Sequence, residues 1–164
     1  MSDATFLTWP FFEDRHRALA ADLDKWAARE LAHVDHTDTD SACRALVRSL
    51  GEGGWLKHAA VDPNGTGSLD VRTLCLIRET LARHDGLADF AFAMQGLGTG
   101  AISLFGTTAQ KEAWLPLIRT GQAISAFALT EPSSGSDVAN STMTATRDGD
   151  SYVLNGAKTW ISNG

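Results

Sequence analysis

The sequence predicts an α+β protein, in which an all-α domain precedes the first strands of an antiparallel β domain. Two observations support this prediction: apolar residues recur at helical spacing as far as about residue 122, and they alternate with period two afterwards. Helices that come first and strands that follow indicate separate α and β parts rather than alternating βαβ units. We therefore expect a helical domain over residues 1–122 and the beginning of a β domain over residues 123–164.

Four apolar stripes predict the first four helices. The first is entered through Pro10, and the second closes at Gly51. The fourth contains Gly96, Gly98 and Gly100, each costing about 1 kcal/mol of helix propensity relative to alanine, which suggests close packing against another surface or a ligand. In order, the stripes are Phe12, Leu19, Leu23 and Trp26; Ala42, Leu46 and Leu50; Leu74, Ile77 and Leu81; and Phe90, Met94, Leu97, Ala101 and Leu104.

Helix-end signals complete the helical part. Asp70 is expected to cap the third helix. Thr107 and Gln110 form a capping box that starts a fifth helix, in which Pro116 should cause a kink or a restart. Gly121 should end that helix.

Period-two alternation predicts short strands after residue 122, separated by turn signals at Asp148-Gly149 and Asn155-Gly156. A sheet this small has few ways to cover its edges. We therefore expect the chain to be a fragment or to be completed by other polypeptide. The predicted strands are residues 124–129, 142–146, 151–154 and 158–162.

Charge and hydropathy exclude some classes of function. The formal net charge of −6 disfavours nucleic acid as a partner, because such binding needs a basic surface. The N-terminus does not read as a secretory signal, and no apolar run reaches membrane-spanning length, so we expect a cytoplasmic protein that does not enter a membrane.

The sequence does not predict a metal site. Cys43 and Cys75 lie in helical patterns and are interpreted as buried apolar thiols rather than as a disulfide or metal pair. The loop over residues 62–73 resembles a calcium loop, but Thr73 stands where the bidentate glutamate is needed. Its other matching residues are Asp62, Asn64, Thr66, Gly67, Leu69 and Asp70. The histidines have no metal-ligand or triad spacing: His16, His33, His36, His58 and His84.

Two features near residue 130 suggest a ligand site. Leu129 and Thr130 follow a predicted strand, so a main-chain N–H and a hydroxyl can be presented together. The alternative is that this hydroxyl only satisfies a local turn. Gly135 and Ser136 occupy a turn whose consecutive N–H groups can form a concavity suited to a pyrophosphate.

Four segments together resemble the signature of the acyl-CoA dehydrogenase family. They are ALTEPSSGSD at residues 128–137, DGDSYVLNGAKTWISNG at 148–164, LFGTTAQKEAWLPLIRTGQ at 104–122 and LGEGGW at 50–55. The family form is roughly T-E-P-x-A-G-S-D, followed by D-G-x-x-Y-x-L-N-G-x-K-x-W-I-T-N-G. Ser134 and Ser162 depart from the usual alanine and threonine. The order and spacing of the motifs make this resemblance specific over nearly the whole chain.

The resemblance implies a helical N-terminal domain, an antiparallel β-barrel-like middle domain and a C-terminal helical bundle, the last missing from this chain. It implies an oxidoreductase that dehydrogenates an acyl-CoA thioester at its α,β positions, passing a hydride to N5 of FAD and electrons onward to an electron-transfer flavoprotein. It also implies fatty acid or amino acid catabolism and a homo-oligomer, either a tetramer or a dimer. The catalytic base is expected in the C-terminal polypeptide, so the 164-residue chain alone should be inactive.

The resemblance also assigns site residues. Gly135 and Ser136 match the turn at the FAD phosphates, and Ser136 also matches the position that touches the pantetheine chain of the substrate. Glu131 and Pro132 are interpreted as structural, with Glu131 bonding to neighbouring main chain. The remaining flavin-contacting positions match Phe127, Leu129, Thr130, Trp160 and Ser162, the last two expected on one face of a strand.

An apolar wall for the acyl chain is expected on the fourth predicted helix, although the same side chains could instead be domain core. The residues concerned are Phe90, Ala93, Met94 and Leu97. Two other functions remain open. One is an oxygen-using relative, such as an acyl-CoA oxidase or a flavin monooxygenase. The other is a non-catalytic fragment or partner subunit of a split enzyme.

Overall fold

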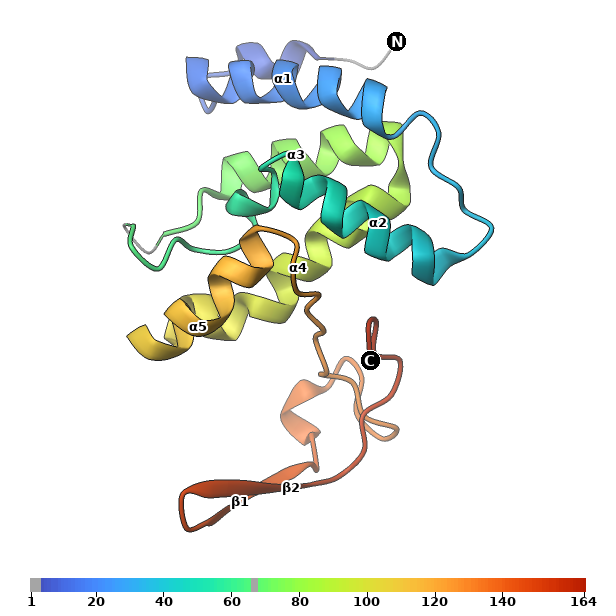
Figure 1. Cartoon of the computed structure of the whole chain (residues 1–164). Coiled ribbons are helices and arrows are strands. Elements are labelled where there is room, and N and C mark those ends of the chain that lie inside the picture. Colours follow the sequence, from blue (N-terminus) through green and yellow to red (C-terminus); the bar gives the residue numbers. More distant parts are fainter. Residues whose placement is uncertain (1–3, 66–67) are drawn as a thin grey trace. The chain divides into compact units, whose positions relative to one another are not determined.

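The computed structural model describes residues 4–65 and 68–164 and divides the chain into two compact units, Met1–Ser125 and Ala126–Gly164. The first unit is helical and the second contains an antiparallel pair of strands, which confirms the predicted α+β class (Figure 1). The main elements are α1 (Asp14–Glu30), α2 (Thr39–Glu52), α3 (Val71–His84), α4 (Gly86–Phe105), α5 (Thr108–Arg119), β1 (Thr144–Asp148) and β2 (Ser151–Asn155). Short 3₁₀ helices cover Thr5–Thr8, Leu56–His58 and Val138–Asn140.

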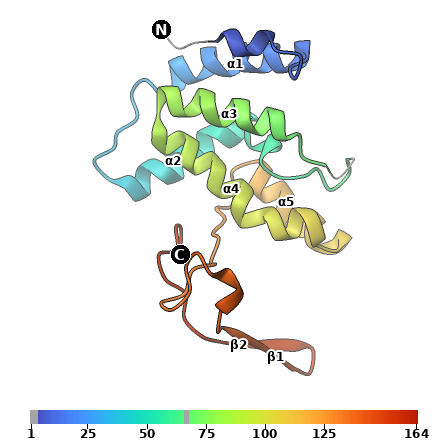
Figure 2. The ribbon, with the colours of Figure 1, turned by 180° about the vertical axis from the view of Figure 1, so that it is seen from behind.

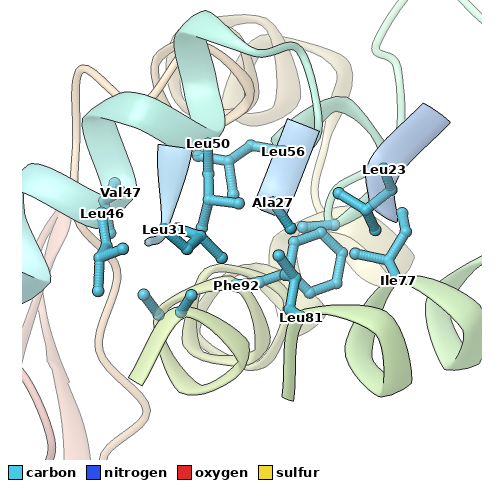
Figure 3. Close-up of a cluster of buried hydrophobic side chains, with 13 residues drawn as sticks. Leu23, Ala27, Leu31, Leu46, Val47, Leu50, Leu56, Ile77, Leu81 and Phe92 are labelled. Carbon is cyan, nitrogen blue, oxygen red and sulfur yellow. The ribbon is translucent and has the colours of Figure 1, made fainter. Parts of the chain in front are cut away.

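The core of the helical unit lies between its first four helices. Helix α1 packs along α3, both α2 and α3 contact α4, and α4 also contacts α5 (Figures 1 and 2). Figure 3 shows the ring of Phe92 next to Leu81 in the centre of the buried cluster. Burial of these side chains supplies the main stabilisation of the unit, at about 25 cal/mol per Å² of apolar surface. The cluster consists of Leu23, Ala27, Leu31, Leu46, Val47, Leu50, Leu56, Ala59, Ile77, Leu81, Ala88, Ala91 and Phe92.

Side-chain caps explain where the helices begin. Asp38, Asp70 and Asp85 each accept hydrogen bonds from main-chain N–H groups of the first turn of α2, α3 and α4. Thr107 and Gln110 form the reciprocal capping box of α5. The predicted roles of Asp70 and Thr107 are therefore confirmed.

Three sequence expectations for the helices need correction. Pro10 and Phe12 precede α1, which begins only after its N-cap Glu13. Helix α2 continues through Gly51 to Glu52, and this glycine has a packing role instead, because a Cβ there would lie 2.3 Å from the carbonyl oxygen of Thr120. Helix α5 runs through Pro116 as one helix, so the expected restart is wrong, whereas the kink stays a prediction.

The thiols also differ from expectation. Cys75 is exposed and Cys43 is only half-buried, and both are free. Both lie on helices, α3 and α2 respectively, yet the faces that form the core are those of Ile77 and Leu46. Helical spacing alone therefore did not place these cysteines on the buried side.

The second unit contains a two-stranded β-hairpin whose residues are all exposed. Strands β1 and β2 pair with Thr144 opposite Asn155 and Asp148 opposite Ser151, which confirms the predicted hairpin. The connecting turn uses Gly149 at φ 58°, a left-handed conformation that glycine adopts at little cost. Thr142 lies outside β1, because its main-chain N–H bonds to Glu131 instead of a neighbouring strand.

Residues 124–129 and 158–162 are not strands, contrary to the prediction. A strand needs a ladder of main-chain hydrogen bonds to a neighbour. Among the described residues, no main-chain hydrogen bond joins these two segments, and the nearest link runs from the Thr159 N–H to the carbonyl of Thr130, one residue beyond the first segment, at 2.9 Å. Trp160 also adopts φ 57°, which interrupts an extended backbone, so the expected alternation of Trp160 and Ser162 on one strand face is wrong.

Two further sequence expectations concern a membrane and a metal. In the described part of the chain, no helix is long and apolar enough to cross a membrane. The same residues contain no group of three or more His, Cys, Asp or Glu side chains able to hold a metal ion. Thr66 and Gly67 of the calcium-like loop lie outside the described residues.

Candidate functional site

Glu131 is the most enclosed carboxylate of the second unit, with 3% of its surface exposed. It accepts hydrogen bonds from the N–H of Thr142 at 2.6 Å, the hydroxyl of Thr142 at 2.8 Å, the N–H of Met143 at 3.0 Å and Nζ of Lys158 at 2.9 Å. The Thr142 N–H, followed by Lys158, lowers the pKa of Glu131 to about 2. Glu131 is therefore an ionised structural acceptor, which confirms its interpretation as a residue that bonds neighbouring main chain.

Lys158 and Thr159 hold the main chain at residues 129–130. Nζ of Lys158 donates to the carbonyl of Leu129 at 2.9 Å, and the N–H of Thr159 donates to the carbonyl of Thr130 at 2.9 Å. A peptide group is planar and trans, so the N–H of Thr130 points away from the Leu129 carbonyl and hence from Lys158. Among the described residues, neither that N–H nor the Thr130 hydroxyl has a hydrogen-bond partner. One donor of fixed direction, the N–H, and one rotatable hydroxyl are thus left without a partner among the described residues.

Apolar side chains near these donors are uncovered within this unit. Phe127 is 44% exposed, Leu129 is 36% exposed and Trp160 is 89% exposed. Trp160 directly follows Thr159, so the bond from Thr159 to Thr130 brings the tryptophan close to the donors along the chain. Exposed large apolar groups beside polar donors indicate a candidate interaction or ligand-binding surface. Ser162 is half-buried two residues further on.

The turn after Glu131 is closed by Ser134. Glu131 and Ser134 exchange two main-chain hydrogen bonds, of 2.8 and 3.1 Å, and the buried hydroxyl of Ser134 donates to the carbonyl of Asp137 at 2.5 Å. Gly135 and Ser136 are consequently exposed at the tip of this turn, and a Cβ at Gly135 would meet nothing within 4 Å. The pyrophosphate turn expected from the sequence is therefore accessible in this unit.

The expected acyl wall on α4 divides between core and surface. Met94 is 7% exposed and belongs to the buried face, whereas Phe90 is 40% exposed and Leu97 is 54% exposed. Ala93 and Leu97 line an apolar groove of about 270 Å³. Gly96 lies on the same groove, where an added Cβ would lie 3.2 Å from the carbonyl oxygen of Ala59. The other lining residues are Ala59, Leu69, Leu74, Arg78 and Phe92.

Sequence reasoning missed two residues that organise these segments. Lys158 stands in the quoted DGDSYVLNGAKTWISNG segment, where a lysine between small residues and a tryptophan was a signal that could have been followed. Gln95 is a lone amide in the middle of an apolar helix, and it is fully buried. Its Nε2 donates to the carbonyl of Ala123 at 2.8 Å, and its Oε1 accepts from the N–H of Ser125 at 2.9 Å.

Comparison with known families agrees with both units. The chain matches the model of the acyl-CoA dehydrogenase N-terminal domain over residues 13–122 and that of the acyl-CoA dehydrogenase middle domain over residues 126–164. The protein thus combines the helical domain and the start of the β domain of one class of oxidoreductase. It belongs to the acyl-CoA dehydrogenase family, which confirms the resemblance read from its motifs.

Individual relatives agree with this assignment. The mitochondrial short-chain specific acyl-CoA dehydrogenase of Homo sapiens is 34% identical over 92% of this chain and 37% of its own length. A Bacillus anthracis acyl-CoA dehydrogenase solved in complex with FAD is 33% identical, with a TM-score of 0.77 over 99% of this chain and 31% of its own. A structure described as the electron transferring flavoprotein of Acidaminococcus fermentans is 31% identical, with a TM-score of 0.76. The match covers 93% of this chain and 41% of the chain in that structure.

The relatives are longer than the chain. It spans between 14% and 39% of the lengths of the curated relatives that it matches.

Proposed function

We propose that the intact protein is an FAD-dependent oxidoreductase that dehydrogenates an acyl-CoA thioester between its α and β carbons. The observation that carries the proposal is the pair of unpartnered donors on Thr130, held beside exposed Phe127, Leu129 and Trp160. Family membership and the relative solved with FAD support it. The cofactor, substrate and reaction all belong to this proposal.

The donor set fits a flavin. A flavin ring has two flat apolar faces and a polar edge that gains negative charge on reduction, so it needs apolar cover together with N–H and O–H donors. Phe127, Leu129 and Trp160 would supply the cover, and Thr130 would supply the donors. When bound, FAD supplies the two-electron acceptor for the reaction. Ser162, which has a hydroxyl, is proposed as a further contact to the ring.

The exposed turn fits the phosphates of the same cofactor. Gly135 and Ser136 present main chain without covering side chains, and Ser136 adds a hydroxyl. We assign the FAD pyrophosphate to this turn and the pantetheine chain of the substrate to Ser136. Asp137 is oriented by the side-chain amide of Asn140, which donates to it.

The groove on α4 is assigned to the acyl chain. Ala93 and Leu97 line it, and its surface is mainly apolar, as a hydrocarbon chain requires. Phe90 is exposed on the same helix and is assigned to the mouth of the acyl site. Met94 is buried and its carbonyl accepts a hydrogen bond from the Ser125 hydroxyl, so we assign it to the core that holds α4 in place rather than to the acyl site.

Proton removal from the substrate is not assigned to Glu131. Its oxygens already accept four hydrogen bonds and its pKa is lowered to about 2, so it would be a weak base with no access to a substrate. We therefore assign the base to polypeptide outside this chain. Transfer of electrons to an electron-transfer flavoprotein, a role in acyl catabolism, a cytoplasmic location and a homo-oligomeric state complete the proposal.

An anaerobic titration tests this function. The purified intact protein should bind FAD, and an acyl-CoA of suitable chain length should remove the visible absorbance of the flavin. Reoxidation by an electron-transfer flavoprotein, and slow reoxidation by oxygen, would separate a dehydrogenase from an oxidase. Absence of FAD binding, or an unchanged flavin spectrum with every acyl-CoA of a chain-length series, would contradict the proposal.

A further inference from the structure

Lys158 lies in an unusual place for a lysine. Its side chain is 19% exposed, and its partner Glu131 has a side chain that is 2% exposed. Lysine is rarely so enclosed unless it is paired, because removing an ammonium group from water is costly. Nζ of Lys158 lies 2.9 Å from a Glu131 oxygen and 2.9 Å from the Leu129 carbonyl oxygen. The ammonium is therefore fixed between a buried carboxylate and one particular peptide.

Glu131 is itself immobilised by the second unit. Two main-chain N–H groups and one hydroxyl, from Thr142 and Met143, hold its carboxylate. These hydrogen bonds keep it ionised, because they favour the charged form. The carboxylate thus fixes the position of the ammonium, and it does so from the residue that directly follows Thr130.

The peptide between Leu129 and Thr130 joins the ammonium to the unpartnered donor. A cation that bonds to the carbonyl oxygen draws electron density from the peptide, which makes the N–H on the opposite side a stronger donor. The planar peptide also fixes the direction of that N–H. Lys158 can therefore act on a ligand through Thr130 while contacting only the Leu129 carbonyl and Glu131.

We propose that Lys158 is a positioning residue for the flavin, which aligns the Leu129–Thr130 peptide and strengthens the Thr130 N–H as a donor to the ring. This inference rests on the proposed function and deepens it. Reduced flavin carries more negative charge than oxidised flavin, so a stronger donor and a nearby cation favour the reduced form. Lys158 therefore stabilises bound FAD and raises its reduction potential.

Substitution in the intact protein tests the role. Lys158→Met keeps most of the length of the side chain and removes its charge, whereas Lys158→Arg keeps the charge. Lys25→Met is the matched control, because the side chain of Lys25 is 79% exposed on α1. The measurements are the FAD dissociation constant of the apoprotein, the reduction potential of the bound flavin and the unfolding temperature of the apoprotein.

We expect Lys158→Met to weaken FAD binding about tenfold, because the Thr130 N–H becomes a weaker and less firmly held donor, and to shift the potential to more negative values. Lys158→Arg should keep most of the FAD affinity and most of the reduction potential of the unmodified protein. Lys25→Met should change neither the affinity nor the potential. The potential separates positioning from simple structural support, because it is measured on flavin that is bound. An unchanged potential in Lys158→Met overturns the inference, even where its unfolding temperature falls. If the unmodified protein binds no FAD, the proposed function is overturned together with the inference.

Discussion

The side-chain oxygen of Gln95 accepts a 2.9 Å hydrogen bond from the main-chain N–H of Ser125, thirty residues further along the chain. The amide of the same side chain donates to the carbonyl of Ala123, and the Ser125 hydroxyl donates to the Met94 carbonyl. Gln95 is fully buried. This single side chain therefore ties the last residues of the helical unit to the middle of α4.

Replacing Gln95 with leucine should destabilise the helical unit by about 2–4 kcal/mol. The reason is that the buried N–H of Ser125 and the partly buried carbonyl of Ala123 would each lose the hydrogen bond to Gln95, at about 1–3 kcal/mol per group. Urea unfolding of the intact apoprotein measures the change. The exposed Gln122→Leu is the control and should stay within about 0.5 kcal/mol of the unmodified protein. An equally small effect of Gln95→Leu would show that the two main-chain groups find other partners.

Asp70→Asn should lower the free energy of unfolding by about 2 kcal/mol. Asp70 caps α3 and accepts from Nε2 of buried His16 at 2.9 Å, so the substitution weakens a cap and the link between α1 and α3. Thermal unfolding at neutral pH measures the loss. Asp22→Asn, on the exposed side of α1, is the control and should have little effect.

Acidic pH should reduce the contribution of Asp70 to the free energy of unfolding. Burial alone would raise its pKa, but hydrogen bonds from His16 and Thr73 and the charge of Arg15 outweigh burial and hold the pKa well below its ordinary 3.8. The folded pKa is depressed, so the contribution is complete above about pH 4 and is lost as the pH falls below that value. The Asp70→Asn variant should therefore lose less stability than the unmodified protein on acidification, and an identical loss would contradict the assignment.

Because of His58, the stability of the folded protein should fall as the pH is lowered from 6.5 to about 4. Burial, followed by the charges of Lys57 and Arg119, lowers the pKa of His58 from 6.5 to about 4. Over this interval the unfolded chain binds a proton that the folded chain excludes, so stability falls as the pH falls. His58→Gln should flatten the dependence of unfolding temperature on pH in this window. His33→Gln, at an exposed position, is the control, and an equal slope in all three proteins would count against the assignment.

Trp160→Ala should weaken FAD binding about tenfold, because the proposed apolar cover of the ring is lost. Trp160 is 89% exposed within its unit, so the unfolding temperature of the apoprotein should change little. Fluorescence titration of the apoprotein with FAD measures the affinity. Trp114→Ala, which removes a 54% exposed tryptophan on α5, should leave it unchanged. Equal affinities in the two variants would remove Trp160 from the site.

Ala93→Phe should shift substrate preference towards shorter acyl chains. Ala93 lines the groove of about 270 Å³, and a phenyl ring there would fill part of the space assigned to the acyl chain. We expect the ratio of kcat/KM for long over short acyl-CoA substrates to fall about tenfold. Ala101 lies at an exposed position of the same helix, so Ala101→Phe is the matched control and should leave the ratio unchanged. A constant ratio in Ala93→Phe would place the acyl chain elsewhere.

Local patterns in the sequence were sufficient for much of the fold. The stripes at Leu23, Leu46 and Ile77 predicted three helices because the side of a helix that faces a core repeats every three to four residues. Asp70 and Thr107 marked helix starts, since a cap depends only on residues within one turn. The hairpin at Gly149 was also evident, because its turn requires left-handed backbone.

Only the tertiary structure decided the features that depend on partners distant in sequence. Gly51 leaves room for the main chain of Thr120 and does not end its helix, and residues 124–129 are not a strand because no ladder partner is present among the described residues. Lys158 belongs to the candidate site because Leu129 and Glu131 are folded against it. A hydrogen bond between residues about thirty positions apart leaves no periodic signal, so the sequence determined which side chains exist and the fold determined which of them meet.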